Sequence, residues 1–558
     1  MMVQCRTLSA VVVALAFAGA CNGSRDQSFA GEVTRSWNPR AVKEVKDVPI
    51  ETLRSEIQRE LAKKPTFATD EQWGHVRGLY KGYQNAPLWL DDDGLIKKRA
   101  DALVDALVSA TTDGINIDQY SLFDLASLLD TVRRSDKPTA AQLAKADLLL
   151  TIAYASLAED YLTGQIDPKS VGHSWHIEPQ EGEVDSALVR SLRDKDLAEA
   201  FKRMRPQDYD YEMLRQKLGD LRKIASAGGW PAIPAGKSLK KGDAEAPARL
   251  QALRNRLRTE GISFNGPEGA TAFDQSFATA LAQFQARHAI VVDSQLGKET
   301  LDALNVPATF RLAQIAANLE RYRWLPRMMG DKYVFVNVPA FRLEGYENGK
   351  KTIEMKVIVG SEYEGRSTPV FSDKMEFVVF RPYWNVTPGI AAKEFFPVYG
   401  SNLPAGYETY TEKGNLRIRQ VPGPKNSLGL VKFMFPNDFN IYLHDTPNDN
   451  LFKKDVRAFS HGCIRLEKPN ELAQWVLGWD ANRVEQAMQN GPDNRTVMLP
   501  KKIPVYIAYM TAYVRDGGLW FGNDLYNRDN QLADAVARGA MPSGEAVRAV
   551  EALRQLTD

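Results

Sequence analysis

The hydrophobic pattern of this chain changes its period near residue 331, and this change limits the folds that the chain can adopt. Before that point, apolar residues recur at helical spacing, as they do over residues 100–110 and 144–162. After it, β-branched and aromatic runs end at Gly or Pro, which is typical of strands. The predicted strands cover residues 332–338, 352–359 and 375–380. The Asn348-Gly349 pair predicts a hairpin turn. We therefore expect a multi-domain α+β protein that is helical first and β-rich later.

A chain of 558 residues is longer than one hydrophobic core usually serves, so we expect several domains. The Gly/Pro/Ala/Lys-rich stretch after residue 228 reads as a linker, and the turn-rich aromatic stretch 388–429 reads as a capping loop. The expected order is a signal peptide (1–20), a tether (21–47), a helical scaffold domain (48–228), a linker (229–248), a small helical module (249–307), a connecting helix (308–330), a β-rich domain (331–526) and a C-terminal helix (527–558).

The composition is that of an ordinary soluble globular protein. Apolar residues make up 44% of the chain, charged residues 25%, and the net charge is +1. A nucleic-acid-binding protein usually carries a strongly basic face, which this overall balance does not suggest. We expect no nucleic-acid partner.

The first twenty residues indicate export. Arg6 is followed by an apolar run over 8–17 and then by small residues up to Ala20 and Cys21. The run is too short to span a membrane, and no later run approaches that length. One interpretation is ordinary cleavage after Ala20; the other is lipidation of Cys21, which would anchor the protein to a membrane, with Asn22 favouring the outer membrane. Either way we expect a periplasmic protein.

Cysteine usage points to a reactive residue. The chain has only Cys5, Cys21 and Cys463, and the first two lie in the signal or at its cleavage site. An exported protein with one remaining thiol has no disulfide framework. An unpaired thiol in an oxidising compartment is a liability unless it has a task, although a buried core cysteine is the alternative.

The residues around Cys463 favour the reactive interpretation. His444 ends an apolar, strand-like run and can take the proton of a nearby thiol. Gly462 lets the backbone turn tightly, and N–H groups in such a turn can form an oxyanion hole. Arg465 can bind a substrate carboxylate or brace the loop.

Metal binding is a weaker interpretation of the histidines. His461 and Cys463 are separated by one residue, with no second cysteine or clear acidic ligand beside them. The pair His173 and His176 lies far away in the sequence and reads as surface or packing, and His75 and His288 read as structural. We expect neither a metal nor another cofactor.

At these residues the sequence resembles the L,D-transpeptidase (YkuD-type) family. The resemblance rests on Ser460-His461-Gly462-Cys463 with His444 upstream, on Arg465, and on a Pro-x-Trp-x-Val-x-Pro segment around Trp384. The module over 249–307 resembles a type 1 peptidoglycan-binding domain; a plain three-helix bundle that only packs between domains is the alternative. The order of scaffold, module and capped catalytic domain is similar to that of the long YcbB-like enzymes, over about residues 48–526.

The resemblance implies that Cys463 attacks the third residue of a peptidoglycan tetrapeptide stem and that His444 acts as the base. A thioester forms, and a third-residue amine of another stem completes a cross-link without a cofactor. Peptidoglycan stems and glycan are the expected partners, with cell-wall synthesis proteins as further partners. The resemblance also gives substrate-binding candidates, which are Arg465, His461, Ser460, Asp445, Trp384 and Tyr407. Three alternatives stay open: a carboxypeptidase or endopeptidase that uses water, attachment of a protein to the wall, and a non-catalytic wall-binding scaffold.

Overall fold

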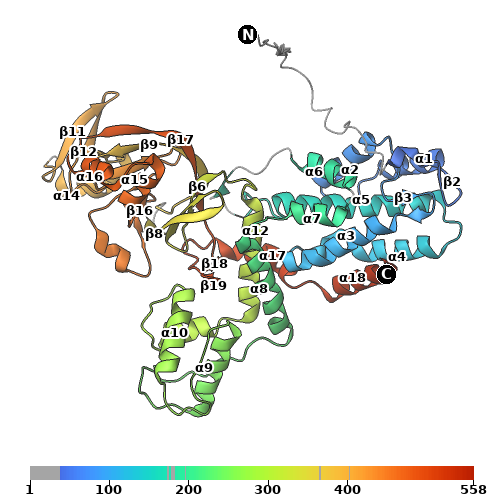
Figure 1. Cartoon of the computed structure of the whole chain (residues 1–558), viewed down its shortest axis with the longest axis horizontal. Helices are drawn as coiled ribbons and strands as arrows, with labels where there is room; N and C mark the ends of the chain where they lie inside the picture. Colours follow the sequence, from blue (N-terminus) through green and yellow to red (C-terminus); the bar gives the residue numbers. More distant parts are fainter. Residues whose placement is uncertain are drawn as a thin grey trace, which may run out of the picture.

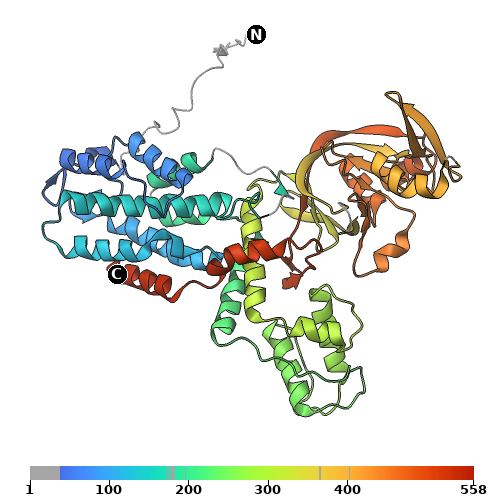
Figure 2. The same ribbon diagram turned by 180° about the vertical axis from the view of Figure 1, so that it is seen from behind.

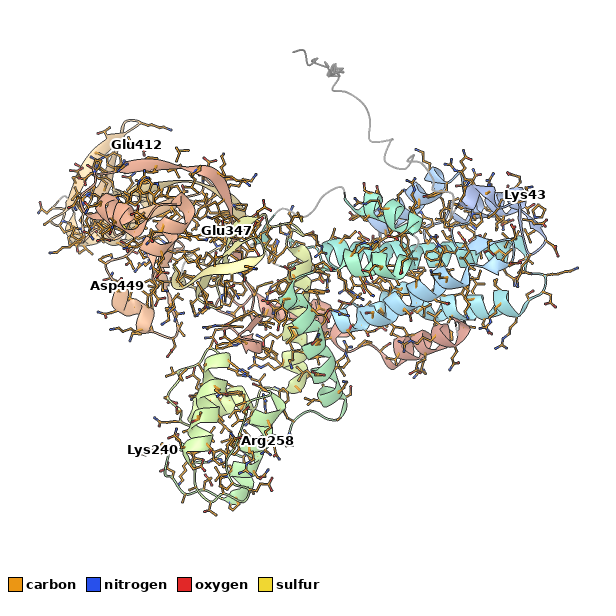
Figure 3. The ribbon with its side chains drawn as sticks, in the orientation of Figure 1. Lys43, Lys240, Arg258, Glu347, Glu412 and Asp449 are labelled. Carbon is orange, nitrogen blue, oxygen red and sulfur yellow. The ribbon has the colours of Figure 1, made fainter. Side chains whose placement is uncertain are left out.

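The computed structural model describes residues 38–171, 175–177, 183–194, 196–362, 366–400 and 402–557. It shows a helical lobe, a small lobe and a β-rich lobe, each with its own hydrophobic core, arranged around helix α12 (Ala308–Trp324) (Figure 1). Lys43 and Glu412 mark opposite ends of the molecule, while Lys240 marks the small lobe (Figure 3). The expected signal peptide, with Cys5 and Cys21, lies outside the described residues and stays a prediction.

The helical lobe is built around α5 (Ala140–Thr163), which is buried along most of its length because it is apolar on all faces. Its elements are η2 (Pro39–Ala41), β1 (Glu44–Val45), β2 (Val48–Pro49), α1 (Ile50–Glu60), α2 (Asp70–Gly82), β3 (Leu90–Asp91), β4 (Gly94–Leu95), α3 (Lys97–Ala110), η3 (Thr111–Asp113), η4 (Ile117–Tyr120), α4 (Leu122–Arg134), α5, α6 (Glu183–Arg193) and α7 (Leu197–Met204). Both helices predicted from periodicity are confirmed. Across the described ranges, no helix combines the length and apolarity needed to cross a membrane.

The end of the chain returns to this first lobe. The sequence predicts one C-terminal helix, but the structure has α17 (Asp529–Ala540) and α18 (Gly544–Thr557), separated at Pro542. Proline disfavours helical geometry in the residue before it, which accounts for the break. Helix α17 packs on α12, whereas α18 joins the core of the helical lobe against α3 and α4, as Figure 2 shows from behind.

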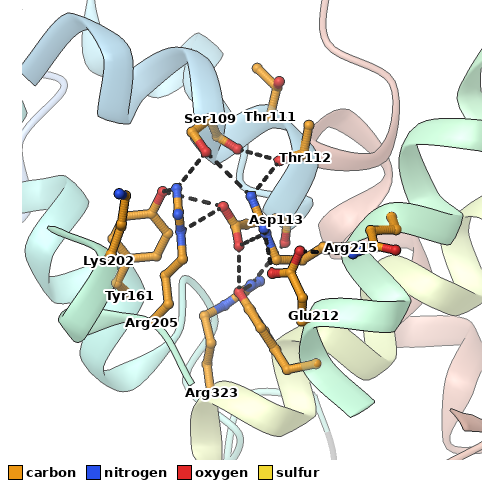
Figure 4. Close-up of polar contacts among 12 residues, drawn as sticks. Ser109, Thr111, Thr112, Asp113, Tyr161, Lys202, Arg205, Glu212, Arg215 and Arg323 are labelled. Carbon is orange, nitrogen blue, oxygen red and sulfur yellow. Dashed lines mark hydrogen bonds and ion pairs between the residues drawn. The ribbon is translucent and has the colours of Figure 1, made fainter. Parts of the chain in front are cut away.

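A buried polar cluster joins the helical lobe to the centre of the molecule (Figure 4). Asp113 is fully buried, and its carboxylate forms ion pairs with Arg205 and Arg215, at 3.1 and 2.6 Å. Arg215 comes from α8 (Tyr209–Ser226), and Arg323 of α12 donates to the Asp113 carbonyl oxygen at 2.8 Å. Arg323 is itself paired with the buried Glu320. Every charge in this junction therefore faces an opposite charge or a polar group.

The small lobe contains α9 (Pro247–Thr259), α10 (Gln275–Arg287) and α11 (Lys298–Leu304) around a compact apolar core. His288 lies at its border with α12, where its Nε2 is 2.7 Å from a Glu260 carboxylate oxygen and its Nδ1 accepts from Arg311 at 3.1 Å. This buried histidine joins two parts of the fold.

The β-rich lobe is one sheet that closes on itself. Its strands are β5 (Trp175–His176), β6 (Lys332–Asn337), β7 (Arg342–Glu347), β8 (Lys350–Gly360), β9 (Val370–Phe380), β13 (Val431–Met434), β14 (Leu443–His444), β15 (Ala458–Ser460), β16 (Ile464–Leu466) and β17 (Arg495–Ala508). They run in the order β13-β14-β16-β8-β7-β6-β17-β9, and β9 pairs with β13. The predicted strands and the Asn348-Gly349 turn are confirmed. Helices α15 (Pro469–Leu477) and α16 (Ala481–Gln489) and the hairpin β18 (Ala512–Arg515)–β19 (Gly518–Phe521) complete the lobe, which η6 (Asp449–Lys453) borders.

The predicted capping loop is an ordered subdomain. It contains β10 (Trp384–Asn385), α13 (Pro388–Ile390), the π-helical turn η5 (Ala391–Phe395), α14 (Phe396–Tyr399), β11 (Tyr407–Glu412) and β12 (Asn415–Gln420). The three strands pair in the order β10-β12-β11 over a small core that includes Val386 and Phe395. Lys413 and Gly414 both have positive φ, as a two-residue type I′ hairpin requires. We call residues 384–420 the cap.

Candidate active site

The sheet register places the candidate residues on one face. Strands β14 and β16 are parallel neighbours, with His444 opposite Arg465 and Leu443 opposite Ile464. Because side chains alternate between the faces of a strand, Cys463 shares the face of His444 and Arg465. Leu443 and Ile464 face the other way and are fully buried in the core. The register thus brings the predicted thiol and base together.

Two residues that the sequence analysis did not single out lie on the same face. Lys432 of β13 is opposite His444, and Tyr442 precedes His444 by two residues. All these side chains, together with Cys463, line one pocket of about 540 Å³. The Lys432 ammonium lies 5.7 Å from the centre of the Tyr442 ring. The sheet face of the pocket therefore combines the thiol of Cys463 with an imidazole, a phenol and two cationic side chains.

A backbone hydrogen bond sets the tautomer of His444. Its Nδ1 is 2.5 Å from the carbonyl oxygen of Asp445, and a carbonyl can only accept, so Nδ1 carries the proton. Nε2 is then left with a lone pair. Burial, with a smaller contribution from the Arg465 charge, lowers the pKa of His444 to about 3. The imidazole is therefore neutral near pH 7 and available as a base.

The thiol of Cys463 is also neutral in the free protein. Burial raises the pKa of Cys463 above its usual value, while hydrogen bonds from Tyr442 and the charges of Arg465 and Lys432 act in the opposite direction. The thiol Sγ is 3.6 Å from the carbonyl oxygen of Asn440. A neutral thiol beside a neutral base must transfer its proton during attack, and the two cations would stabilise the thiolate as it forms.

The turn before the cysteine is held by hydrogen bonds. Gly462 has φ +111°, a region that favours glycine, and its N–H donates to the Ser460 hydroxyl oxygen at 3.2 Å. The Ser460 hydroxyl donates in turn to the Cys463 carbonyl. Thr368, which is fully buried, donates to the Gly462 carbonyl at 2.8 Å and accepts from the Gly360 N–H at 2.9 Å. The predicted tight turn at Gly462 is confirmed.

Arg465 is a cation with unused hydrogen-bonding capacity. Within the part of the chain that the structure describes, its Nε is buried and has no hydrogen-bond partner. Burial lowers the pKa of Arg465 from its usual value, but guanidinium groups stay charged at neutral pH. Such a group fits a ligand carboxylate that enters the pocket.

The cap forms one wall of the pocket and is joined to the cysteine loop. Trp384, Ile390 and Glu394 of the cap line the pocket. Glu394 is 2.6 Å from Nε2 of His461 and 2.8 Å from a guanidinium nitrogen of Arg366. One carboxylate thus connects the cap to the residue two positions before Cys463.

Comparison with known proteins agrees with this geometry. The family described as L,D-transpeptidase catalytic domain matches residues 331–507, which hold most of the β-rich lobe and the residues that line the pocket. The family described as scaffold domain matches residues 74–218, within the helical lobe. Residues 331–507 are an L,D-transpeptidase catalytic domain.

A curated relative is also described as an L,D-transpeptidase. The chain is 31% identical over 245 residues to a putative L,D-transpeptidase of Haemophilus influenzae, an alignment that covers 39% of this chain and 48% of the relative. The chain thus spans about half the length of the relative that it matches. An L,D-transpeptidase structure from Xylanimonas cellulosilytica has 16% identity and a TM-score of 0.16, covering 49% of this chain and 99% of its own. A fused Zn-dependent amidase/peptidase/peptidoglycan-binding protein structure from Clostridium acetobutylicum has 13% identity and a TM-score of 0.15, covering 49% and 100%.

Two of the predicted substrate-binding residues of the transpeptidase domain have other contacts. The Asp445 carboxylate accepts from the backbone N–H groups of Leu430 and Thr446, both at 2.7 Å, so it braces two turns outside the pocket. Tyr407 packs in the cap against Phe395, at 5.0 Å between ring centres, and against Trp384. The structure does place Arg465, His461, Ser460 and Trp384 in the pocket lining.

Several residues around the transpeptidase pocket were missed from the sequence. Tyr442 and Lys432 could have been found, because strand period two places Tyr442 with His444 and because Lys432 interrupts an apolar run. Thr368 and Glu394 reach the cysteine loop only through tertiary contacts, and no local pattern marks them. Of the histidine pair predicted to be surface or packing, His173 lies outside the described residues and His176 packs against Phe439 at 4.7 Å.

Proposed function

We propose that this protein is an exported L,D-transpeptidase that cross-links peptidoglycan stem peptides through a thioester on Cys463. The arrangement of Cys463, His444 and Arg465 on one pocket face is the observation that carries this proposal. The family match of residues 331–507 supports an enzyme that acts on peptidoglycan. The cysteine dependence and the acceptor are our own inferences.

Acylation uses the neutral thiol and the neutral imidazole. Sγ of Cys463 attacks the carbonyl carbon of the third stem residue, and its proton passes to Nε2 of His444. The C–N bond to the terminal D-alanine then breaks, and the departing nitrogen takes that proton from His444. The product is a thioester and a free D-alanine. Lys432 and Arg465 stabilise the sulfur while it carries negative charge.

Deacylation runs through the same groups in reverse. The side-chain amine of a second stem attacks the thioester carbonyl and gives up a proton to His444. The C–S bond breaks, an amide forms between the two stems, and the proton returns from His444 to the thiolate. Atoms and charges balance without a cofactor, and the positive imidazole exists only within each step.

The pocket walls fit a peptide with carboxylates. Arg465 has a buried Nε free for a carboxylate of the stem. Trp384 and Ile390 of the cap offer apolar surface opposite the sheet. We infer that the stem lies between the cap and the sheet, that the small lobe (249–307) binds the glycan nearby, and that the segment before residue 38 exports the protein, with Cys21 as a lipid anchor.

Product analysis tests the proposal. Purified protein without its first twenty residues is incubated with a disaccharide-tetrapeptide, and the products are separated by liquid chromatography and identified by mass. We expect cross-linked dimers and D-alanine from the wild type, none from Cys463→Ala, and a rate lower by about 10³-fold from His444→Ala. A matched control is His176→Asn, an exposed histidine that does not line the pocket.

Other products would identify the alternatives. Tripeptide without dimers would mean that water is the acceptor and would contradict cross-linking. No conversion by folded protein that still sediments with cell walls would leave a wall-binding scaffold. Equal activity in Cys463→Ala would contradict the thioester.

A further inference from the structure

A second group of reactive side chains lies in the helical lobe, far along the chain from Cys463. Glu71 and His75 are one turn apart on α2, and Glu159 comes from α5. One nitrogen or oxygen atom of each lies within 4.8 Å of the others. Helices α2, α5 and α6 pack together at this point (Figure 1). Three side chains thus converge from two helices on one spot.

A neighbouring carboxylate orients the histidine. Nδ1 of His75 is 2.6 Å from a carboxylate oxygen of Asp185 on α6, and because an ionised carboxylate only accepts hydrogen bonds, Nδ1–H is the donor. In the neutral imidazole, Nε2 of His75 then carries a lone pair. In the described part of the chain, this Nε2 and Oε2 of Glu159 are both buried without a hydrogen-bond partner. A buried polar atom without a hydrogen-bond partner lowers the stability of the fold, so both of these atoms need an explanation.

Local charge also favours a bound cation. The carboxylates of Glu71, Glu159 and Asp185 surround a single imidazole, so even a protonated histidine leaves an excess of negative charge. A divalent cation would offset this excess.

We propose that Glu71, His75 and Glu159 bind one divalent transition-metal ion, with zinc the best fit. One imidazole and two carboxylates suit zinc, and three protein ligands leave a position for water. The Asp185–His75 contact is the hydrogen bond that metal-ligating histidines usually make through their second nitrogen. The ion would tie α2 to α5 and stabilise the helical lobe. This site is separate from the proposed active site, and its role does not depend on that chemistry.

Zinc titration of the full exported chain tests the site. Cys463→Ala serves as the background, so that the pocket thiol cannot bind the ion. The protein is stripped with a chelator and titrated with zinc by calorimetry. We expect one ion per chain, and at least tenfold weaker binding in His75→Asn, Glu159→Gln and Glu71→Gln. Asp185→Asn should weaken binding by about 10- to 100-fold through the orientation of His75.

Matched controls separate the site from general charge effects. His176→Asn and Glu199→Gln remove an exposed imidazole and an exposed carboxylate elsewhere, and both should bind as the background does. Glu71 is exposed, so Glu71→Gln should fold normally. Zinc should also raise the melting temperature of the background and leave that of the His75→Asn variant unchanged. Absence of stoichiometric binding, or equal affinity in folded Glu71→Gln and His75→Asn, would overturn the proposal.

Discussion

Two regions of the protein hold their charged side chains in opposite ways. At the junction around Asp113, two arginines pair with one carboxylate and a third pairs with Glu320. In the transpeptidase pocket, Lys432 and Arg465 face a neutral thiol and a neutral imidazole. No carboxylate that the structure describes forms an ion pair with Arg465.

This difference separates structure from chemistry. A buried charge is tolerated when an opposite charge offsets its desolvation, as at Asp113. Cations without such partners remain available for a substrate carboxylate and for a thiolate that exists only during reaction. Substitutions at the junction should therefore change stability, and substitutions in the pocket should change activity.

The largest expected effect is at the junction. Asp113→Ala leaves Arg205 and Arg215 buried without their carboxylate and should lower the free energy of unfolding by about 3–5 kcal/mol. Asp302→Ala breaks the exposed pair with Lys298 and should leave the free energy of unfolding almost unchanged, because solvent screens this pair. Urea unfolding of both variants measures the difference. Equal losses of unfolding free energy in the two variants would show that the buried ion pairs stabilise the protein no more than an exposed one.

The pH dependence of Cys463 tests whether the pocket is neutral. Since burial raises the pKa of its thiol, the thiolate fraction should still rise between pH 7 and 9, by roughly a hundredfold. Iodoacetamide alkylation should follow that rise. With the pKa of His444 near 3, acylation by substrate should show no inflection between pH 5 and 8. A plateau in alkylation at low pH would instead indicate a preformed thiolate–imidazolium pair.

Replacing Arg465 should lower the activity toward the substrate without lowering the stability of the fold. Arg465→Ala should lower kcat/KM for the tetrapeptide by about 10- to 100-fold, the value of a lost charge-assisted hydrogen bond. Its free energy of unfolding should stay the same or rise slightly, because the buried Nε has no partner. Arg457→Ala is the matched control, since this arginine donates to the carbonyls of Val357 and Lys454 and should affect stability. The reverse pattern would contradict our account.

The cap contact should have the smallest effect. Glu394→Gln weakens the contacts of the cap with His461 and Arg366, which are partly exposed and worth about 1 kcal/mol or less. We expect KM to rise about two- to fivefold, with faster hydrogen exchange over residues 388–400. Glu408→Gln, which alters a pair with Arg419 in the β11–β12 hairpin, should change neither. Unchanged KM and exchange in Glu394→Gln would show that this contact does not position the cap.

The sequence predicted those features of the fold and the site that depend on residues close together in the chain. The motif around Cys463 and the turn at Asn348-Gly349 were predicted because neighbouring residues alone determine the spacing of the motif and the backbone conformation of the glycines. The Lys413-Gly414 turn carried a similar signal, but the polar strands beside it did not alternate clearly, so the cap was predicted as a loop. The return of α18 to the helical lobe and the bracing by Thr368 depend on contacts between distant segments, which spacing does not reveal.

Intact-protein mass spectrometry tests the central claim most directly. A tetrapeptide donor is incubated with the wild type, with Cys463→Ala and with Arg465→Ala. Each reaction is quenched in acid, and the mass of the intact protein is measured. Our account predicts a wild-type adduct equal to the donor minus D-alanine, located on Cys463 and released by hydroxylamine as a thioester. It predicts slower adduct formation in Arg465→Ala and no adduct in Cys463→Ala. No adduct on folded wild type, or an adduct that persists in Cys463→Ala, would contradict it.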